Sequence, residues 1–293
     1  MVSFTHFKIL HRRIEHEKSC LLGSRQYWQA RLRIMQGVLR CVMLRRQRYV
    51  KILRGGGGKL PIRSPEILKS LDFDAVVLGT AMGFDDVSKQ LRDMGIPEYK
   101  IDKKYVFLLI QSRILFLKRF AERVRREGIT GSVAEAGVYR GDFAKHINKY
   151  FSDRNCYLFD TFSGFTDYDI AREQKESMTS ADYMKNTSVD EVLAKMPNRD
   201  KIILRVGRFP ETAHGIDDSF AFVNLDMDLY EPTIEGLRFF YPKMSEGGVI
   251  LIHDYFSEAY PNIEQSVDNF EHELGARLHK IPIGDDISIA IVK

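Results

Sequence analysis

Apolar and polar positions follow two recurring patterns along the chain, and these patterns predict strands and helices in turn. Short apolar runs that end at a polar residue predict buried strands, and apolar residues spaced three or four positions apart predict helices that bury one face. Strands are predicted at 74–79, 132–137, 157–160, 201–206, 220–225, 247–252, 277–283 and 287–292. Helices are predicted at 85–94, 103–127, 189–196 and 263–274, with others beginning near 65, 142 and 232. This alternation predicts an α/β fold with a largely parallel, doubly wound sheet.

The N-terminal part of the chain has a different pattern. Over residues 28–53, apolar residues recur at roughly helical spacing with arginines between them, so we expect a basic, partly helical arm over residues 1–58. The four glycines at 55–58 are expected to form a linker, because their spacing does not match a phosphate-binding loop. Residues 59–104 are predicted to form a small α/β unit that is similar to half of a Rossmann-like domain.

Charge is distributed unevenly along the sequence. The 293 residues carry 44 basic and 40 acidic side chains, a net charge of +4, but residues 1–58 hold 13 of the basic side chains and only two acids. That arm therefore carries +11, and the rest of the chain carries −7. A basic amphipathic arm can pack on its own protein, bind a partner or lie on an anionic membrane. Nucleic acid is not expected as a partner, because the remaining chain has no basic stripe or aromatic motif for it.

Cysteine usage and hydropathy indicate the compartment. Three cysteines, at positions 20, 41 and 156, are too few and too far apart for a disulfide framework or a cysteine-pair zinc site. No apolar run approaches the roughly 18 residues of a membrane span, and charged residues interrupt the N-terminus where a signal peptide would be apolar. We therefore expect a cytoplasmic protein, with the arm as its one candidate for contact with the inner face of a membrane.

A glycine turn follows the strand predicted at 132–137. That strand contains Glu135 and ends at Gly137, and the turn continues through Tyr139 to Gly141 before a helix begins. Such a turn brings backbone N–H groups and a helix start close to a bound nucleotide. The spacing is G-x-x-x-G rather than the G-x-G-x-x-G of dinucleotide sites, so S-adenosylmethionine, which has no phosphate, fits better. The positive charges of that molecule also suit an acidic Glu135.

The next two strands end in further candidate cofactor residues. Asp160 ends the second strand, 23 residues after Gly137, where a carboxylate can accept both ribose hydroxyls. The third strand ends at Gly207, and its edge would lie beside the adenine in a doubly wound sheet. Arg208 or Phe209 could cover that ring, and the alternative is a tight structural turn. The order and spacing of these features predict that the chain binds a nucleotide or S-adenosylmethionine.

Acidic residues follow the fourth and fifth strands of the predicted sheet. Asp226 and Asp228 come after the fourth strand, and His253 and Asp254 come after the fifth. These strands are neighbours in a 3-2-1-4-5 sheet, so their polar ends should meet at one edge. The cluster suits methyl transfer to a hydroxyl, which needs a base, a metal ion or both because its pKa lies far above 7. Two or three carboxylates would hold Mg²⁺, and the ion would acidify a bound hydroxyl.

Two residues of this cluster have an alternative interpretation. Asp228 is either a metal ligand or the cap of the helix that begins near Pro232. His253 is either part of the reactive site or a hydrogen-bonded neighbour of the ligands.

Five stretches resemble the macrocin O-methyltransferase (TylF-type) family of class I S-adenosylmethionine-dependent enzymes, namely 133–141, 159–165, 207–212, 225–233 and 247–255. The resemblance implies a Rossmann-like sheet of order 3-2-1-4-5-7-6 and Mg²⁺-assisted O-methylation of sugar hydroxyls. It implies metal ligands at Asp226 and Asp254. His253 stands where the family pattern has Asp, so it is expected to ligate the metal, to act as the base, or to weaken metal binding.

These predictions divide the chain into the arm at 1–58, the half-Rossmann-like unit at 59–104 and a methyltransferase domain at 105–293. The long polar segment 166–200 is expected to close over the substrate. We expect an O-methyltransferase that acts on a glycan, a nucleotide sugar or a glycosylated natural product, either as a monomer or as a homo-oligomer. The alternatives are a nicotinamide-dependent oxidoreductase and a non-catalytic scaffold of glycan biosynthesis. The expected catalytic residues are Asp226, His253 and Asp254, with Asp226, Asp254 and Asp228 as metal ligands.

Overall fold

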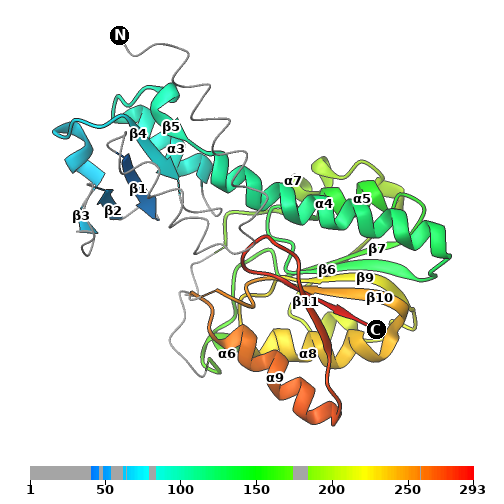
Figure 1. The fold of residues 1–293 in the computed structure, drawn as a ribbon. Helices are drawn as coiled ribbons and strands as arrows, with labels where there is room; N and C mark the ends of the chain where they lie inside the picture. Colours follow the sequence, from blue (N-terminus) through cyan, green and yellow to red (C-terminus); the bar gives the residue numbers. More distant parts are fainter. Residues whose placement is uncertain are drawn as a thin grey trace. The chain divides into compact units, whose positions relative to one another are not determined.

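The computed structural model describes residues 41–45, 49–53, 62–63, 65–78, 84–173, 184–257 and 259–293. The chain divides between Gln111 and Ser112 into two compact units, which are considered one at a time (Figure 1). Most of the basic arm and the linker at 55–58 lie outside the described residues, so the expectations about membrane or partner contact stay predictions.

The first unit contains a five-stranded sheet of order β3-β2-β1-β4-β5. Its strands are β1 (Cys41–Arg45), β2 (Tyr49–Leu53), β3 (Ile62–Arg63), β4 (Ala75–Leu78) and β5 (Ile101–Asp102). Strand β4 lies parallel to β1 and β5, whereas β2 is antiparallel to β1 and β3. The helical elements are η1 (Pro65–Lys69), α3 (Phe84–Asp93) and η2 (Glu98–Lys100). Buried apolar residues of β4 and α3, including Val76, Leu78, Val87 and Leu91, form the core of this unit.

The helix predicted across residues 28–53 is wrong from Cys41 onward. Residues 41–45 and 49–53 form an antiparallel pair of strands instead. The intervening arginines suggested a helical repeat, but both segments are rich in apolar and β-branched residues that also suit a strand. Pairing of β1 with β4 on its other side decides between the two conformations, because it adds a second row of interstrand hydrogen bonds. The small α/β unit therefore begins before residue 59.

The second unit contains a seven-stranded sheet of order β11-β12-β10-β9-β6-β7-β8. The strands are β6 (Ser132–Ala136), β7 (Cys156–Asp160), β8 (Ile202–Val206), β9 (Phe220–Leu225), β10 (Met244–Ile252), β11 (His279–Pro282) and β12 (Ile289–Val292). Numbered within this unit, the order is 3-2-1-4-5-7-6, which confirms the predicted sheet. Strand β12 runs antiparallel to its neighbours β10 and β11 and completes the predicted hairpin.

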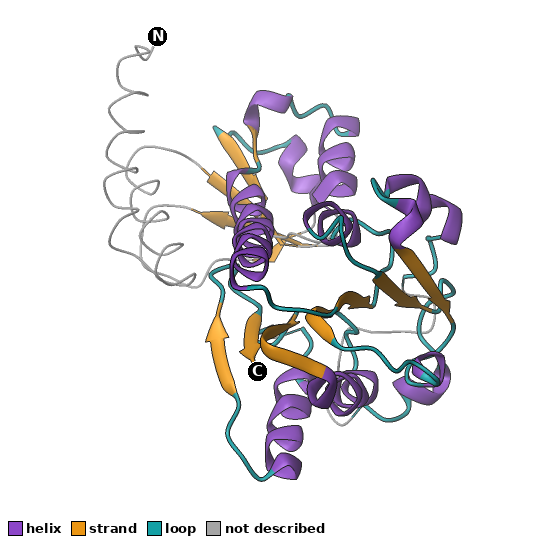
Figure 2. Cartoon of the chain, turned by 90° about the vertical axis from the view of Figure 1, so that its right-hand side faces the viewer, coloured by secondary structure: helices purple, strands orange, loops and turns teal. Residues whose placement is uncertain are grey.

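Helices cover both faces of this sheet. From Ser112 on, α4 (Lys104–Glu127) shares one face with α5 (Ala144–Tyr150) and α7 (Val189–Lys195), and α8 (Tyr230–Phe240) and α9 (Asn262–Leu274) cover the other (Figures 1 and 2). The shorter helical elements are α6 (Asp167–Ile170), η3 (Arg199–Lys201), η4 (Glu211–Ala213) and η5 (Tyr241–Lys243). Among the described residues, no helix combines the length and the apolar character that crossing a membrane requires.

The two faces of the sheet form two separate layers of hydrophobic core. Strand β9 is buried along its whole length, as a central parallel strand covered on both faces should be. Phe222 faces the layer of α4 and α5, whereas Phe220 packs edge-on against Phe240 of α8. This rigid sheet fixes the carboxyl ends of β6, β7, β9 and β10, and the candidate site lies at those ends.

Candidate active site

The glycine turn after β6 lies against the loop that follows β9. Gly137 has φ +86°, and a Cβ atom there would lie 1.9 Å from the backbone oxygen of Asp226. The N–H of Asp226 donates to the carbonyl of Ala136 at 2.9 Å, which joins the two loops. Only glycine allows this close approach of two backbones. The turn and the acidic cluster are therefore parts of one site.

Asp160 holds the glycine turn in place. Its Oδ2 accepts hydrogen bonds from the backbone N–H groups of Val138 at 2.8 Å and Tyr139 at 2.7 Å, and its Oδ1 accepts from Phe162 at 2.7 Å. The bonds to ribose hydroxyls stay a prediction. Oδ1 has a second lone pair that could accept such a hydroxyl. The structure adds a role that the sequence did not suggest, since Asp160 fixes the backbone of the turn.

The segment that leads into α7 also contacts the turn. The Tyr139 hydroxyl donates to Asn186 Oδ1 at 2.5 Å, and Arg140 pairs with Glu191 at 2.7 Å. A Cβ atom on Gly141, which has φ +74°, would lie 3.0 Å from Cγ1 of Val192. Part of the long segment that was predicted to close over the substrate is thus bound to the glycine turn.

The acidic cluster forms where β9 and β10 end. Nδ1 of His253 lies 2.9 Å from Oδ1 of Asp226 and 2.9 Å from Oδ2 of Asp254. One ligand atom from each of these three residues lies within 4.8 Å of the other two. The backbone N–H of His253 donates to the carbonyl of Leu225 at 2.9 Å, so the pairing of β9 with β10 sets this geometry. The structure brings together the three residues that the sequence predicted as catalytic.

Burial and charge determine the protonation of this cluster. Burial and the charge of Arg113 lower the pKa of His253, but Asp226 and Asp254 outweigh them and raise it to about 10. Burial acts to raise the pKa of Asp226, whereas the charges of His253 and Arg113 and their hydrogen bonds hold it well below its ordinary value. At neutral pH, His253 is therefore an imidazolium that hydrogen-bonds an ionised Asp226.

Asp228 does not cap α8, so that alternative is wrong. The N-cap position belongs to Leu229, and no side chain caps the helix from there. Asp228 is 6% exposed and has φ +60°. Burial and the charges of Asp254 and Asp226 raise its pKa well above the ordinary value. Within the described part of the chain, the set of clustered ligand atoms does not include Asp228, so its metal-ligand role stays a prediction.

Arg113 of α4 is a residue of this site that the sequence analysis missed. Its NH2 group donates to Asp226 Oδ2 at 2.9 Å and to Asn224 Oδ1 at 2.9 Å. Asn224 in turn donates from Nδ2 to Oε1 of Glu135 at 2.7 Å. A signal for Arg113 does exist in the sequence, because this cation falls on the apolar stripe of the helix, between Val106 and Leu117.

Glu135 lies deeper in the sheet than its expected cofactor role suggested. It is 2% exposed, and its Oε2 has no hydrogen-bond partner among the described residues. Burial and the charge of Asp226 raise its pKa to about 8, so it is mostly protonated at neutral pH. Glu135 therefore brings a neutral, buried carboxyl to the site rather than an exposed negative charge.

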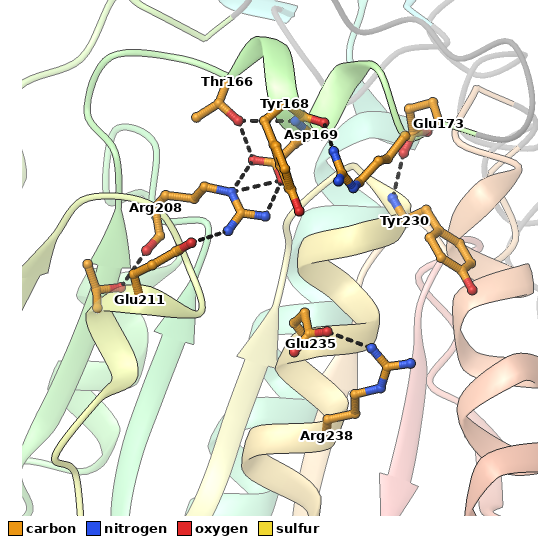
Figure 3. A network of polar contacts seen from close by, with 11 residues as sticks. Thr166, Tyr168, Asp169, Glu173, Arg208, Glu211, Tyr230, Glu235 and Arg238 are labelled. Carbon is orange, nitrogen blue, oxygen red and sulfur yellow. Dashed lines mark hydrogen bonds and ion pairs between the residues drawn. The ribbon is translucent and has the colours of Figure 1, made fainter.

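The structure corrects the role expected of Arg208 and Phe209. Phe209 is 4% exposed and packs edge-on against Phe159 and stacked on Phe240, so its ring belongs to the core and is not available to an adenine. Arg208 pairs with Asp169 at 2.6 Å and Glu211 at 2.5 Å (Figure 3). The alternative, a tight structural turn after Gly207, describes this segment better.

Glu173 is a second residue that the sequence analysis missed. Its Oε1 accepts from the N–H of Tyr230 at 2.7 Å (Figure 3). Its Oε2 accepts from the side chain of Asn262 at 2.5 Å. These two partners stand at the first residues of α8 and α9. One carboxylate thereby connects the starts of the helices that follow the Asp226 and Asp254 loops.

Comparison with known proteins agrees with this arrangement. The model of the family described as macrocin-O-methyltransferase (TylF) matches residues 86–284. The chain belongs to this family. The matched span contains the glycine turn and the acidic cluster. The family resemblance predicted from the sequence is therefore confirmed.

Individual relatives of the TylF-family chain are distant. It is 27% identical over 171 residues to demethyldecarbamoylnovobiocin O-methyltransferase of Streptomyces niveus, a match that covers 54% of this chain and 64% of that protein. It is 29% identical over 160 residues to mycinamicin III 3''-O-methyltransferase of Micromonospora griseorubida, with 49% and 62% covered. The chain thus spans less than two thirds of the length of these relatives.

A solved structure supports the fold. The O-methyltransferase NovP superposes with a TM-score of 0.54 at 24% identity, over 62% of this chain and 79% of that one. The predicted Rossmann-like fold of class I methyltransferases is thereby confirmed.

Proposed function

We propose that this TylF-family chain is an S-adenosylmethionine-dependent O-methyltransferase that methylates a sugar hydroxyl. The observation that carries the proposal is the position of the Asp226–His253–Asp254 cluster beside the glycine turn. Backbone contacts join the two, so a methyl donor on the turn and an acceptor at the cluster would meet. Positioning of this kind is a large part of how an enzyme accelerates a bimolecular transfer.

The donor would lie over the G-x-x-x-G turn. Asp160 holds the Val138 and Tyr139 amides, so the backbone of the turn is ordered before a ligand arrives. The Oδ1 atom of Asp160 can accept a ribose hydroxyl. Gly207 directly follows the neighbouring strand β8, and its N–H donates to the carbonyl of Asp160 at 2.9 Å. The sulfonium becomes a neutral thioether as the methyl group leaves. The donor side of the site therefore does not need to stabilise a phosphate or a developing negative charge.

The acceptor hydroxyl must lose a proton during the transfer. In the arrangement seen here His253 already carries a proton and Asp226 is a weak base, so neither is suited to accept another at neutral pH. These protonation states favour a mechanism in which a divalent cation binds the cluster and His253 gives up its proton.

The donor set fits such a cation. Asp226 and Asp254 offer carboxylate oxygens and His253 an imidazole nitrogen, all within 4.8 Å of one another. Two carboxylates suit Mg²⁺, and the imidazole extends the choice to ions such as Mn²⁺. When bound, the cation would lower the pKa of the acceptor hydroxyl and orient its oxygen. Asp226 and Asp254 would hold it, and His253 would either ligate it or take the proton of the hydroxyl.

The substrate class rests on the relatives. Two of them are named for O-methylation of novobiocin- and mycinamicin-type molecules, and a third for a rhamnosyl-tetracenomycin. The chemistry that these names share is O-methylation, and the rhamnosyl group named in the third favours a sugar hydroxyl as the acceptor. We extend this to a sugar hydroxyl on a glycan, a nucleotide sugar or a glycosylated natural product.

Calorimetric titration distinguishes this proposal from its rivals. We expect S-adenosylhomocysteine, the product of methyl transfer, to bind with one site per chain and NADH to give no heat of binding. Binding of NADH without S-adenosylhomocysteine would establish the oxidoreductase alternative, and binding of neither would favour a non-catalytic scaffold. Titration with Mn²⁺ of the wild type and Asp226→Asn tests the metal, since loss of one carboxylate should weaken binding about tenfold or more.

A further inference from the structure

Arg113 stands between the donor and acceptor sides of the proposed site. Its NH2 group bonds both Asn224, the partner of Glu135, and Asp226 of the acidic cluster. Its guanidinium carbon lies 4.1 Å from the ring centroid of Phe143, which follows the glycine turn by two residues. The Arg113 side chain is 12% exposed. One cation thus contacts elements from both halves of the site.

The hydrogen bonds of Arg113 are incomplete. Its Nε is buried and has no partner among the described residues. A guanidinium presents its N–H groups as a planar fork that matches a carboxylate with two parallel hydrogen bonds. Asp226 does not complete that match, because its Oδ1 is directed to His253 and only its Oδ2 reaches the arginine. Arg113 therefore has capacity for a second carboxylate.

S-adenosylmethionine brings a carboxylate to this part of the site. Its adenosine would lie over the turn and Asp160, and its amino-acid end would extend toward β9, which lies next to β6 in the sheet. The carboxyl of Glu135 is buried, and its raised pKa keeps it mostly neutral at pH 7, so it does not repel an incoming anion as an ionised glutamate would. Arg113 is a cation near this end of the proposed donor site, and its NH2 group is held by Asn224 of β9 and by Asp226, which directly follows β9.

We infer that Arg113 recognises the carboxylate end of the methyl donor and exchanges its present bond to Asp226 for that carboxylate. This inference rests on the proposed function. The exchange frees Oδ2 of Asp226 and removes a positive charge from beside it, so Asp226 becomes a better partner for a cation or an acceptor hydroxyl. Donor binding would thereby prepare the acceptor site, and the two binding free energies would be coupled.

The first test compares two ligands that differ only in the carboxylate. S-adenosylhomocysteine and its decarboxylated analogue are titrated calorimetrically into the wild type, Arg113→Met and Arg119→Met. Arg119 lies on the same helix but is 69% exposed at the surface, so it is the matched control. We expect wild type and Arg119→Met to prefer S-adenosylhomocysteine by about tenfold or more, and Arg113→Met to bind both ligands equally.

An undiminished preference in Arg113→Met would overturn the inference but leave the proposed function intact, whereas failure of the wild type to bind either ligand would reject the proposed function itself. Arg113→Lys is the second variant in case Arg113→Met does not fold. It keeps the charge but not the fork, so we expect a reduced preference.

The second test needs no variant. The affinity of the wild type for Mn²⁺ is measured by water-proton relaxation with no ligand, with S-adenosylhomocysteine and with the decarboxylated analogue. We expect S-adenosylhomocysteine to raise the affinity severalfold and the analogue to raise it less. Equal Mn²⁺ affinity under all three conditions would overturn the exchange.

Discussion

Glu135 keeps its proton in the folded protein because it is buried beside the negative charge of Asp226. Its pKa is about 8 in the folded chain, above the ordinary value of 4.5. The folded state then binds more protons than the unfolded state between these two values. The stabilising contribution is complete at acidic pH and is lost as the pH rises from about 4.5 to 8.

We predict that Glu135→Gln removes this pH dependence. A glutamine cannot ionise, so the stability of the variant relative to wild type should increase by about 1 kcal/mol per pH unit between pH 5 and 8 and level off above. Urea unfolding of both proteins across pH 5–9 measures this difference. Parallel curves would contradict the protonated, buried state of Glu135.

Gly137→Ala should destabilise the protein strongly. The new Cβ would lie 1.9 Å from a backbone oxygen of the Asp226 loop, and the residue would also have φ +86°. Gly128→Ala is the control, because φ there is +67° and no heavy atom lies within 4 Å. We expect the control to cost roughly 1–2 kcal/mol and Gly137→Ala about 4 kcal/mol or more in denaturant unfolding. Equal costs would mean that the two loops do not touch.

For single residues, the sequence predicted site residues that directly follow a strand and missed contacts between residues far apart in the chain. Asp226, His253 and Asp254 each follow a strand directly, so strand order alone predicts that they meet. Arg113 lies 113 residues before Asp226, and only the fold brings the two together. Phe209 follows a strand too, but its ring turns into the core, a choice that packing against Phe240 makes and that spacing does not reveal.

Among the elements, α8 depends on a residue outside itself. Its N-cap residue, Leu229, has no capping side chain, and Glu173 supplies the missing acceptor to the N–H of Tyr230. The sequence suggested Asp228 for this role because aspartate before a helix is a common cap. Asp228 instead lies buried beside Asp254, with which its side chain shares a hydrogen bond.

Glu173→Ala is therefore predicted to destabilise the protein by about 1–2 kcal/mol, the typical cost of a lost cap. Glu235→Ala is the matched control, since Glu235 lies on α8 itself and pairs with Arg238 near the surface. The control should change the free energy of unfolding by no more than about 0.5 kcal/mol. Thermal or urea unfolding compares the two, and an effect no larger in Glu173→Ala would refute the capping role.

Strand and helix boundaries from residue 65 on follow the periodicity of the sequence closely, as for α4 and β9. The error lies at 41–53, where the same apolar spacing suits either conformation. There, β1 gains partners on both edges, and a contact with β4 some thirty residues away decides the outcome.

For the whole molecule, binding of the donor product should stabilise the fold. The proposed donor site is assembled from β6, β7 and β9 together, so an unfolded chain cannot bind the ligand in this way. S-adenosylhomocysteine at 100 times its dissociation constant should raise the free energy of unfolding by about 2.7 kcal/mol. Thermal unfolding with increasing ligand measures the shift, with adenosine as the control that lacks the carboxylate. An unchanged melting temperature would count against the donor site.

Charge also takes on a clearer meaning at this scale. The net charge of +4 combines a basic arm with a body of −7, and the acidic cluster belongs to that body. The sequence predicted the sheet order and the family because both depend on the order in which strands and motifs follow one another along the chain. It placed the start of the small α/β unit too late, because its charge pattern resembled a solvated helix.

In the proposed function, the Asp226 cluster activates a hydroxyl for methyl transfer. The most direct test of this activation is transfer of labelled methyl groups from S-adenosylmethionine to a panel of nucleotide sugars, glycans and glycosylated natural products, by wild type and Asp226→Asn, each with and without a chelator. We predict labelled O-methyl product with the wild type, a loss of about 100-fold or more in Asp226→Asn, and a strong loss with chelator. Undiminished transfer by Asp226→Asn would show that the cluster does not activate the acceptor hydroxyl.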